Sequence, residues 1–232
     1  MTDSAIILLS GGLDSSTVLA QARSQGKTCH ALAFRYGQRH QFELQAARTV
    51  ASALGAATFR TIEINLADVG GSALTAAIDV PKDRSETEMS SSIPITYVPA
   101  RNSIFVAYAI AVAEVLGAGE IIIGVNALDY SGYPDCRPEW VVAMQEVARL
   151  GTKAGVEGRP VKISAPLIHL KKAEIIALGM SLGVNYSLTH SCYDPSENGG
   201  ACGRCDSCSL RRAGFAAAGV QDPTRYAFNA PA

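Results

Sequence analysis

Residues 10–16 read Ser-Gly-Gly-Leu-Asp-Ser-Ser, between the apolar run 6–9 and a stretch with helical character that begins at Thr17. A strand that ends in two glycines and continues as a helix leaves backbone N–H groups pointing outward at the positive end of the helix dipole. Hydroxyl groups add further donors around this turn, from Ser10, Ser15, Ser16 and Thr17. The stretch therefore predicts an anion-binding turn after the first strand of an α/β fold, at the edge where such sheets bind ligands.

Asp14 adds a negative charge to this expected anion site. The lysine of a G-x-x-x-x-G-K-[ST] loop is missing, and so is the glycine spacing of G-x-G-x-x-G, so neither phosphate motif explains the turn. A carboxylate repels phosphates unless it caps backbone N–H groups or holds a divalent cation that bridges to them. We therefore expect ATP-like nucleotide with Mg²⁺ as the ligand, and an ordinary capped strand-to-helix turn is the structural alternative.

Strand-like and helix-like patterns alternate along the chain. Strand-like runs follow at 29–34, which is apolar, and at 58–64, 120–124 and 161–165, and helical character occurs at 41–54, 104–116, 139–153 and 170–179. This order predicts an α/β fold with a Rossmann-like, doubly wound parallel sheet. The polar stretch 65–99 is expected to be a mobile lid or surface excursion. With 232 residues, 48% of them hydrophobic, we expect one nucleotide-binding and substrate domain, residues 1–183, with a C-terminal segment, residues 184–232, packed on it.

Net charge, apolar runs and cysteine content indicate which partners and which cellular compartment to expect for this protein. A formal net charge of −1 gives no electrostatic reason to expect a nucleic-acid partner. The sequence has no run of 18 apolar residues and no charged-then-apolar leader before the first strand, so no membrane contact is expected. We therefore expect a cytoplasmic protein, in which the six cysteines do not form disulfides.

Four cysteines are clustered near the C-terminus with the spacing C-x9-C-x2-C-x2-C, at Cys192, Cys202, Cys205 and Cys208. Four thiolates at this spacing can surround one tetrahedral Zn²⁺, and a [4Fe-4S] cluster accepts the same ligands, so spacing leaves the metal open. Four protein ligands leave no free coordination position, so a zinc here is expected to be structural, one per chain. His190 is expected to be a neighbour of this site and not a ligand.

Two cations stand where they oppose a helix dipole, Arg101 at the start of one predicted helix and Lys172 in the first turn of another. An anionic ligand explains both positions, so we expect Arg101 to bind an anionic substrate group and Lys172 to face phosphate. A surface arginine paired with a nearby carboxylate is the structural alternative for Arg101.

The loop 124–138 follows a predicted strand and combines tyrosines, aspartates and prolines, on the crevice side of an open α/β sheet. A tyrosine ring can stack on a planar heterocycle, and a carboxylate can accept from the N1–H and 2-amino groups of a guanine-like edge. Asp135 is our candidate for that edge and Asp129 the next, with a plain structural loop as the alternative. The predicted substrate-binding residues are Arg101, Asn102, Asp129, Tyr133, Asp135 and Arg137.

Residues 10–16 resemble the signature of the PP-loop ATP pyrophosphatases, the adenine nucleotide alpha hydrolase-like enzymes. With segments 36–38, 98–102, 129–137 and 172–175 and the four cysteines, nearly the whole chain resembles the 7-cyano-7-deazaguanine synthase family. The resemblance implies an ATP-dependent ligase of queuosine biosynthesis that converts 7-carboxy-7-deazaguanine and ammonia to 7-cyano-7-deazaguanine. It implies adenylation of the carboxylate and then of the intermediate amide, with two ATP consumed per turnover.

The same resemblance supports residue assignments. It implies catalytic roles for Ser10, Asp14 and Lys172, and a homodimer is expected. Ala100 stands where the family pattern leads us to expect glycine. The ATP-binding loop is predicted to comprise Leu9, Ser10, Gly11, Gly12, Leu13, Asp14, Ser15, Ser16, Thr17, Val18 and Leu19.

Two other classes of function stay open from the sequence. A tRNA-modifying PP-loop enzyme would also adenylate its substrate, and tRNA binding would distinguish it. A non-catalytic nucleotide-binding module would lack ligand-dependent ATP turnover.

Overall fold

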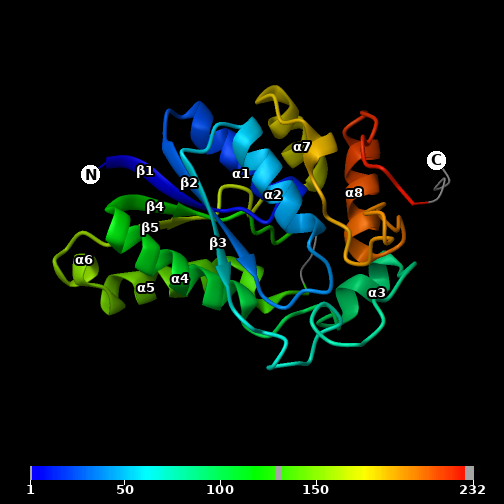
Figure 1. The fold of residues 1–232 in the computed structure, drawn as a ribbon, viewed down its shortest axis with the longest axis horizontal. Helices are drawn as coiled ribbons and strands as arrows, with labels where there is room; N and C mark the ends of the chain where they lie inside the picture. The colour runs from blue at the N-terminus through cyan, green and yellow to red at the C-terminus, as the bar shows by residue number, and fades with distance from the viewer. Residues whose placement is uncertain (1, 129–131, 228–232) are drawn as a thin grey trace.

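A computed structural model describes residues 2–128 and 132–227 of the chain, and its centre is a five-stranded parallel sheet (Figure 1). The strands are β1 (Thr2–Leu8), β2 (Thr28–Arg35), β3 (Thr58–Glu63), β4 (Ala118–Ile122) and β5 (Lys162–Ser164). They pair in the order β3-β2-β1-β4-β5, so the chain builds outward from β1 first to one side and then to the other. The predicted doubly wound α/β fold is confirmed.

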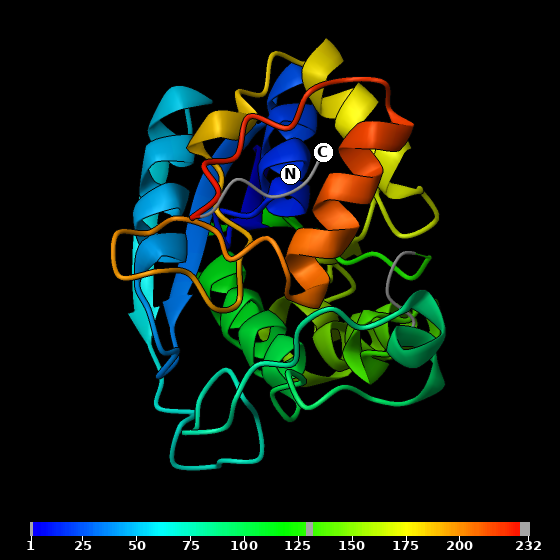
Figure 2. The same cartoon turned by 90° about the vertical axis from the view of Figure 1, so that its right-hand side faces the viewer.

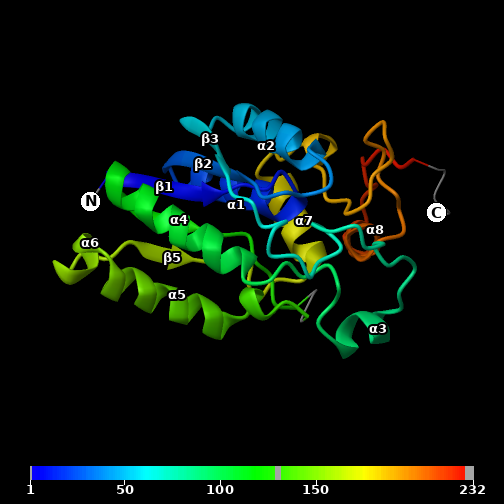
Figure 3. The ribbon, with the colours of Figure 1, turned by 60° about the horizontal axis from the view of Figure 1, so that its bottom comes forward.

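Helices cover both faces of the sheet. One face carries α1 (Leu13–Ser24), α2 (Phe42–Ala53) and α7 (Lys172–Ser181), and the other carries α4 (Arg101–Leu116) and α5 (Pro138–Gly151) (Figures 1 and 3). β1 alternates between the two cores, because Ile7 packs with α1 and Ile6 packs with α4, and both side chains are fully buried. A central strand that is buried on both faces consists of consecutive apolar residues, which is why residues 6–9 can be recognised as a strand from the sequence.

The shorter helices are α3 (Glu86–Ser91), α6 (Lys153–Val156) and the 3₁₀ turns η1 (Pro134–Cys136) and η2 (Tyr186–Leu188). None of the described helices combines the length and the apolar character that a bilayer span needs.

The C-terminal segment packs directly on α1 and α7. Tyr186 and Phe215, the latter on α8 (Asp206–Ala217), are buried in the same core as Val18 of α1. The Tyr186 hydroxyl also shares a 2.7 Å hydrogen bond with Thr17 Oγ1 and donates to Ile175 O of α7. The segment that holds the cysteines is therefore tied to the helix that follows residues 10–12.

The polar stretch 65–99, which the sequence predicts to be a mobile lid or a surface excursion, packs against the C-terminal segment (Figure 2). It contains α3, Lys82 forms an antiparallel bridge with Cys205, and Arg84 forms a 2.8 Å ion pair with the buried Asp206. Its apolar side chains Ala73 and Val80 are buried beside the cysteines. Its order comes from contacts more than 100 residues away in the sequence, which local patterns do not reveal.

Ala100 precedes α4 with φ 53° and ψ 19°, in the left-handed region. A side chain with a Cβ is disfavoured there by about 1–2 kcal/mol, whereas glycine adopts the conformation without this strain. The geometry thus explains why glycine was the expected residue at this position.

Replacing Ala100 with glycine is expected to raise the free energy of unfolding by about 0.5–1 kcal/mol, because relief of strain exceeds the added chain entropy of glycine. Denaturant unfolding measures the change. The matched control is Ala107→Gly, at an exposed position within the same helix, which should lower stability by about 1 kcal/mol. A less stable Ala100→Gly protein would show that the left-handed residue is not strained.

Candidate active site

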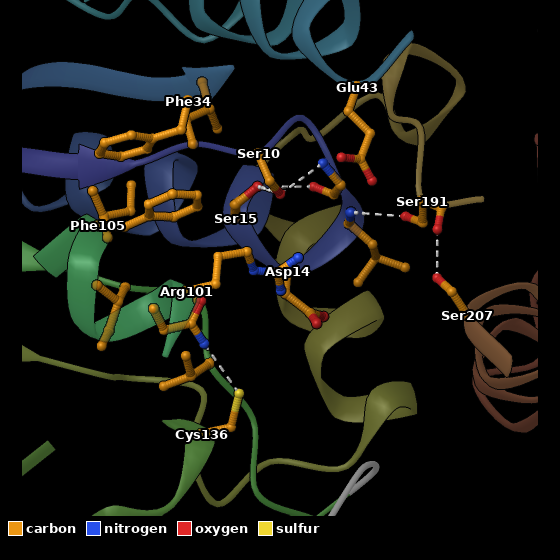
Figure 4. Close-up of a pocket in the computed structure, with 18 of the residues that line it drawn as sticks. Ser10, Asp14, Ser15, Phe34, Glu43, Arg101, Phe105, Cys136, Ser191 and Ser207 are labelled. Atoms are coloured by element: carbon orange, nitrogen blue, oxygen red, sulfur yellow. Dashed lines mark hydrogen bonds between the residues drawn. The ribbon is translucent and has the colours of Figure 1, made fainter. Parts of the chain in front are cut away.

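A cavity of about 300 Å³ opens at the carboxyl ends of β1, β2 and β4, beside the strand where the sheet order reverses (Figure 4). Part of its wall is aromatic, since the Phe34 and Phe105 rings stack with their centroids 3.9 Å apart. Charged and hydroxyl-bearing side chains from the loop after β1 and from α2, α4 and α7 line the rest. An apolar cavity with a few convergent polar groups is typical of a small-molecule site.

The loop after β1 packs closely against α2 and against the residues after β4. Two glycines make these approaches possible, Gly11 in the loop itself and Gly124 after β4. Gly11 has φ +86°, and a Cβ there would lie 2.4 Å from Ala47 N and Glu43 O of α2. Gly124 follows β4, and a Cβ there would lie 3.0 Å from Ser15 N. Glycine at both positions lets the loop lie between α2 and β4, so that its backbone faces the cavity.

Serine hydroxyl oxygens accept hydrogen bonds from backbone N–H groups of this loop. Gly12 N–H donates to Ser10 Oγ (3.2 Å), and Ser10 Oγ lies 3.0 Å from Ser15 Oγ. Leu13 N–H points to Ser191 Oγ at 3.4 Å, and Ser207 of α8 donates to Ser191 O at 2.6 Å. These donors lie at the N-terminus of α1, where the sequence predicts an anion site, and Ser191 and Ser207 beside the cysteines lie next to them.

Asp14 and Lys172 form an ion pair across the cavity wall. Lys172 Nζ lies 2.8 Å from both carboxylate oxygens of Asp14, and both side chains are partly buried. Lys172 is the first residue of α7 and Asp14 lies in the first turn of α1, so the pair joins two helix N-termini at the loop. Lys172 thus lies at the loop after β1, and its predicted contact with phosphate stays a prediction.

Arg101 projects from the start of α4 into the same cavity. Its guanidinium lies 5.5 Å from the centroid of the Tyr36 ring and donates to the Tyr36 hydroxyl at 3.3 Å. Burial acts to lower the pKa of Arg101, but the phenols of Tyr36 and its neighbours and the Glu43 carboxyl raise it overall, so Arg101 stays a cation. Among the described residues, no carboxylate forms an ion pair with Arg101, which leaves its charge available to an anionic ligand.

Asp135 is buried and supports the start of α4 from behind the cavity. Its Oδ2 accepts the backbone N–H of Asn102 at 3.0 Å, and its backbone O accepts the Asn102 side-chain amide, also at 3.0 Å. Burial raises the pKa of Asp135, and the Asn102 hydrogen bond opposes that shift. Asp135 is not among the residues that line the cavity, which differs from the expectation that it contacts substrate directly. The Asp135 carboxylate accepts this N–H group because a backbone N–H in the first turn of a helix has no acceptor within the helix.

Ten of the eighteen residues predicted for the nucleotide and substrate sites line the cavity, and the other eight are not among its described lining residues. Those of the described chain that line it are Leu9, Ser10, Gly12, Leu13, Asp14, Ser15, Arg101, Asn102, Tyr133 and Lys172. Predicted residues behind the lining are Gly11, Ser16, Thr17, Val18, Leu19 and Asp135. Arg137 is exposed at the start of α5, away from the lining, and Asp129 falls outside the described residues.

Several residues that line the cavity were not predicted as site residues, among them Tyr36, Glu43, His190 and Ser191. Tyr36 stands within a segment that carries the family resemblance, so a signal for it was present. Glu43 reads as an ordinary acidic residue in the first turn of a helix, and nothing local marks it as part of the cavity.

The four sulfurs of Cys192, Cys202, Cys205 and Cys208 all lie within 4.8 Å of one another. Cys202 Sγ and Cys208 Sγ are 4.0 Å apart, and zinc–sulfur bonds of about 2.3 Å in tetrahedral geometry separate sulfurs by about 3.8 Å. Backbone N–H groups point at the sulfurs, as from Cys202 to Cys192 Sγ (3.2 Å) and from Cys205 to Cys202 Sγ (3.3 Å). These residues fit a closed four-thiolate metal site in which backbone N–H groups donate to the sulfurs.

Known proteins resemble this chain along nearly its whole length. It is 61% identical over 223 residues to the 7-cyano-7-deazaguanine synthase of Solidesulfovibrio magneticus, which covers 96% of this chain and 95% of that one. It is 59% identical over 226 residues to the enzyme of the same name from Myxococcus xanthus, which covers 97% and 98%. A solved 4-thiouridine synthetase in complex with RNA and bound ATP is 20% identical, with a TM-score of 0.50 over 78% of this chain and 40% of that chain, a likeness of fold alone. The model of the family described as queuosine biosynthesis protein QueC matches residues 4–219. The chain therefore belongs to the QueC family of queuosine biosynthesis proteins.

Proposed function

We propose that this protein is a 7-cyano-7-deazaguanine synthase, an ATP-dependent ligase that acts on 7-carboxy-7-deazaguanine and ammonia. One observation carries the proposal: the hydroxyl-rich loop at the N-terminus of α1 and the cations Lys172 and Arg101 line one cavity at the carboxyl edge of the sheet. The reaction joins two anions, a triphosphate and a carboxylate, which repel each other without such donors and cations. The names of the relatives support the choice of heterocycle.

In this proposal, the loop residues Ser10, Gly12 and Ser15 bind the phosphates of ATP, and Lys172 offsets their charge. The Asp14 carboxylate is the candidate ligand for the Mg²⁺ that accompanies ATP, which would supply charge neutralisation at the phosphates. Arg101 holds the substrate carboxylate, so that its oxygen can attack the α-phosphorus. Pyrophosphate then leaves and an acyl adenylate forms.

The next steps convert this acyl adenylate to a nitrile. Ammonia attacks its carbonyl carbon, AMP leaves, and the product is a primary amide. A second ATP adenylates the amide oxygen, and loss of that oxygen with AMP forms the carbon–nitrogen triple bond. Asn102 and Tyr133 face the cavity near Arg101 and are the described candidates for contacts to the deazaguanine ring, with Asp135 and Arg137 acting through the position of α4 and of the loop.

For the cysteines, we propose one structural Zn²⁺ per chain. A cubane cluster binds each thiolate to a different iron and holds the sulfurs further apart than one central ion does. Sulfurs that all lie within 4.8 Å favour the single ion. In this division of the chain, residues 1–183 bind nucleotide and substrate, and residues 184–232 hold the zinc and supply Ser191 to the loop.

We also propose a cytoplasmic homodimer. Exposed apolar side chains on the adjacent helices α4 and α5 support it, with Val115 84%, Val142 66% and Leu150 64% exposed (Figure 3). Light scattering should then report twice the 24.3 kDa chain mass, and replacing Val115 and Val142 with glutamate should shift the protein towards monomer. A monomeric wild-type protein at micromolar concentration would contradict the dimer.

The test of the proposed function is product analysis after incubation with ATP, ammonium and 7-carboxy-7-deazaguanine. Mass spectrometry should find the amide as an intermediate and the nitrile as the product, with AMP and pyrophosphate formed in proportion. ATP turnover that does not depend on the deazaguanine substrate, or tRNA-dependent turnover, would contradict the proposal.

A further inference from the structure

Glu43 places a second carboxylate in the wall of the cavity. It lies in the first turn of α2, and its backbone oxygen would lie 2.4 Å from a Cβ at Gly11, so α2 lies close beside the loop after β1. The side chain extends from α2 towards the loop and the cavity (Figure 4). Among the described lining residues, the only carboxylates are Asp14 and Glu43, and Asp14 is paired with Lys172. No described side chain forms a hydrogen bond or ion pair with the Glu43 carboxylate.

The Glu43 carboxyl lies in a cavity where two anionic ligands are expected, and its pKa is raised. In the proposed function the loop beside its backbone binds phosphate, and Arg101, whose charge acts on Glu43, is available for an anionic substrate. Burial raises the pKa of Glu43 to about 7, and Arg101 acts in the opposite direction. A negative charge beside two bound anions is unfavourable unless it meets a cation or takes up a proton. A carboxyl with a pKa near neutrality can pair with a cation in its charged form or take up a proton. A general base needs a pKa in this range, because it must accept a proton and release it again at neutral pH.

The proposed reaction needs such a group at the nitrogen. When ammonia attacks the acyl adenylate, its lone pair forms the C–N bond, the C–O bond to AMP breaks with its electron pair on the phosphate oxygen, and nitrogen gives up one proton. Adenylation of the amide oxygen removes a second N–H proton. Loss of AMP from that adenylate forms the triple bond and removes the third. Three protons therefore leave one nitrogen atom during a turnover.

We propose that Glu43 forms the ammonia site, where its carboxylate orients the incoming nitrogen and accepts the protons that this nitrogen loses. This assignment rests on the proposed function and adds the site of its second substrate. Glu43 lies on α2 beside the loop that binds the phosphates, and the charge of Arg101, which holds the substrate carboxylate, acts on its carboxyl, so the acyl adenylate carbon is expected in the same cavity. Each proton passes from Glu43 to solvent before the next step.

The experiment separates adenylation from the nitrogen steps. Exchange of labelled pyrophosphate into ATP, with 7-carboxy-7-deazaguanine present and ammonium absent, reports adenylation alone. Glu43→Gln should keep this exchange within about threefold of wild type, whereas kcat/KM for ammonium, measured by amide and nitrile formation, should fall at least about 100-fold. Conversion of added amide to nitrile should fall as well. Glu43→Asp, which keeps a carboxylate, should lose about tenfold.

Glu139→Gln is the matched control, because Glu139 also lies in the first turn of a helix but is exposed on α5 outside the cavity lining. It should leave both measurements unchanged. Normal ammonium-dependent synthesis by Glu43→Gln would overturn the ammonia site. Loss of pyrophosphate exchange, restored by excess Mg²⁺, would overturn it in favour of a Mg²⁺ ligand. Absence of exchange in the wild-type protein would overturn the proposed function itself, a result distinct from both.

Discussion

Replacing Cys205 with serine is expected to leave the protein without bound metal and largely unfolded. Cys205 is fully buried, and its sulfur lies within 4.8 Å of the other three. Zinc bound by four thiolates contributes on the order of 10 kcal/mol to folding, which is comparable to the whole stability of a typical domain. The segment that would unfold shares the core of α1 and supplies Ser191 to the phosphate-binding loop, so activity should be lost with the fold.

Metal analysis and circular dichroism test this expectation on freshly purified protein. Wild type should contain about one zinc per chain. Cys136→Ser is the matched control, since Cys136 lies outside the four-sulfur cluster and a serine can still accept from Asn102; its metal content and melting temperature should stay close to wild type. Full metal content with an unchanged melting temperature in Cys205→Ser would refute the structural site. Visible absorbance of an iron–sulfur centre in anaerobically purified protein would refute zinc.

Asp14→Asn is expected to abolish most ATP turnover while the protein stays folded. The asparagine keeps the shape of the side chain but removes the charge that meets Lys172 and that would hold Mg²⁺. We expect the rate of product formation to fall at least about 100-fold, the usual cost of losing one preorganised charged group at the reacting centre. Stability should change by less than about 1 kcal/mol, because the ion pair is partly exposed to water. Ser10→Ala should act in the same direction on turnover.

The measurement is substrate-dependent pyrophosphate release, with the melting temperature recorded in parallel. Asp68→Asn, at an exposed aspartate outside the cavity lining, serves as the control and should match wild type in both. Normal turnover by Asp14→Asn would remove Asp14 from the nucleotide site. A rise in KM for ATP with unchanged kcat would assign it to binding alone.

The sequence by itself determined the fold class of this protein and pointed to two candidate centres, the loop 10–16 and the four clustered cysteines. Central parallel strands are buried on both faces, so residues 6–9 and 121–123 are apolar runs that can be recognised in the sequence alone. The loop 10–16 carries its own conformational requirement in its glycines, and four cysteines at fixed spacing need one another to bind a metal. Each of these patterns lies within one short stretch of sequence, so it can be recognised without knowledge of the tertiary structure.

Only the tertiary structure decided which distant groups share the cavity. Glu43 enters the site because Gly11 lets the loop lie against α2, and Ser191 enters because the segment holding the cysteines packs on α1. Asp135 turned out to accept a backbone N–H of α4, although its position in a loop after a strand suggested contact with substrate. The path of residues 65–99 likewise depends on partners such as Asp206, far along the chain. Such placements follow from packing between elements, which residue spacing along one element does not encode.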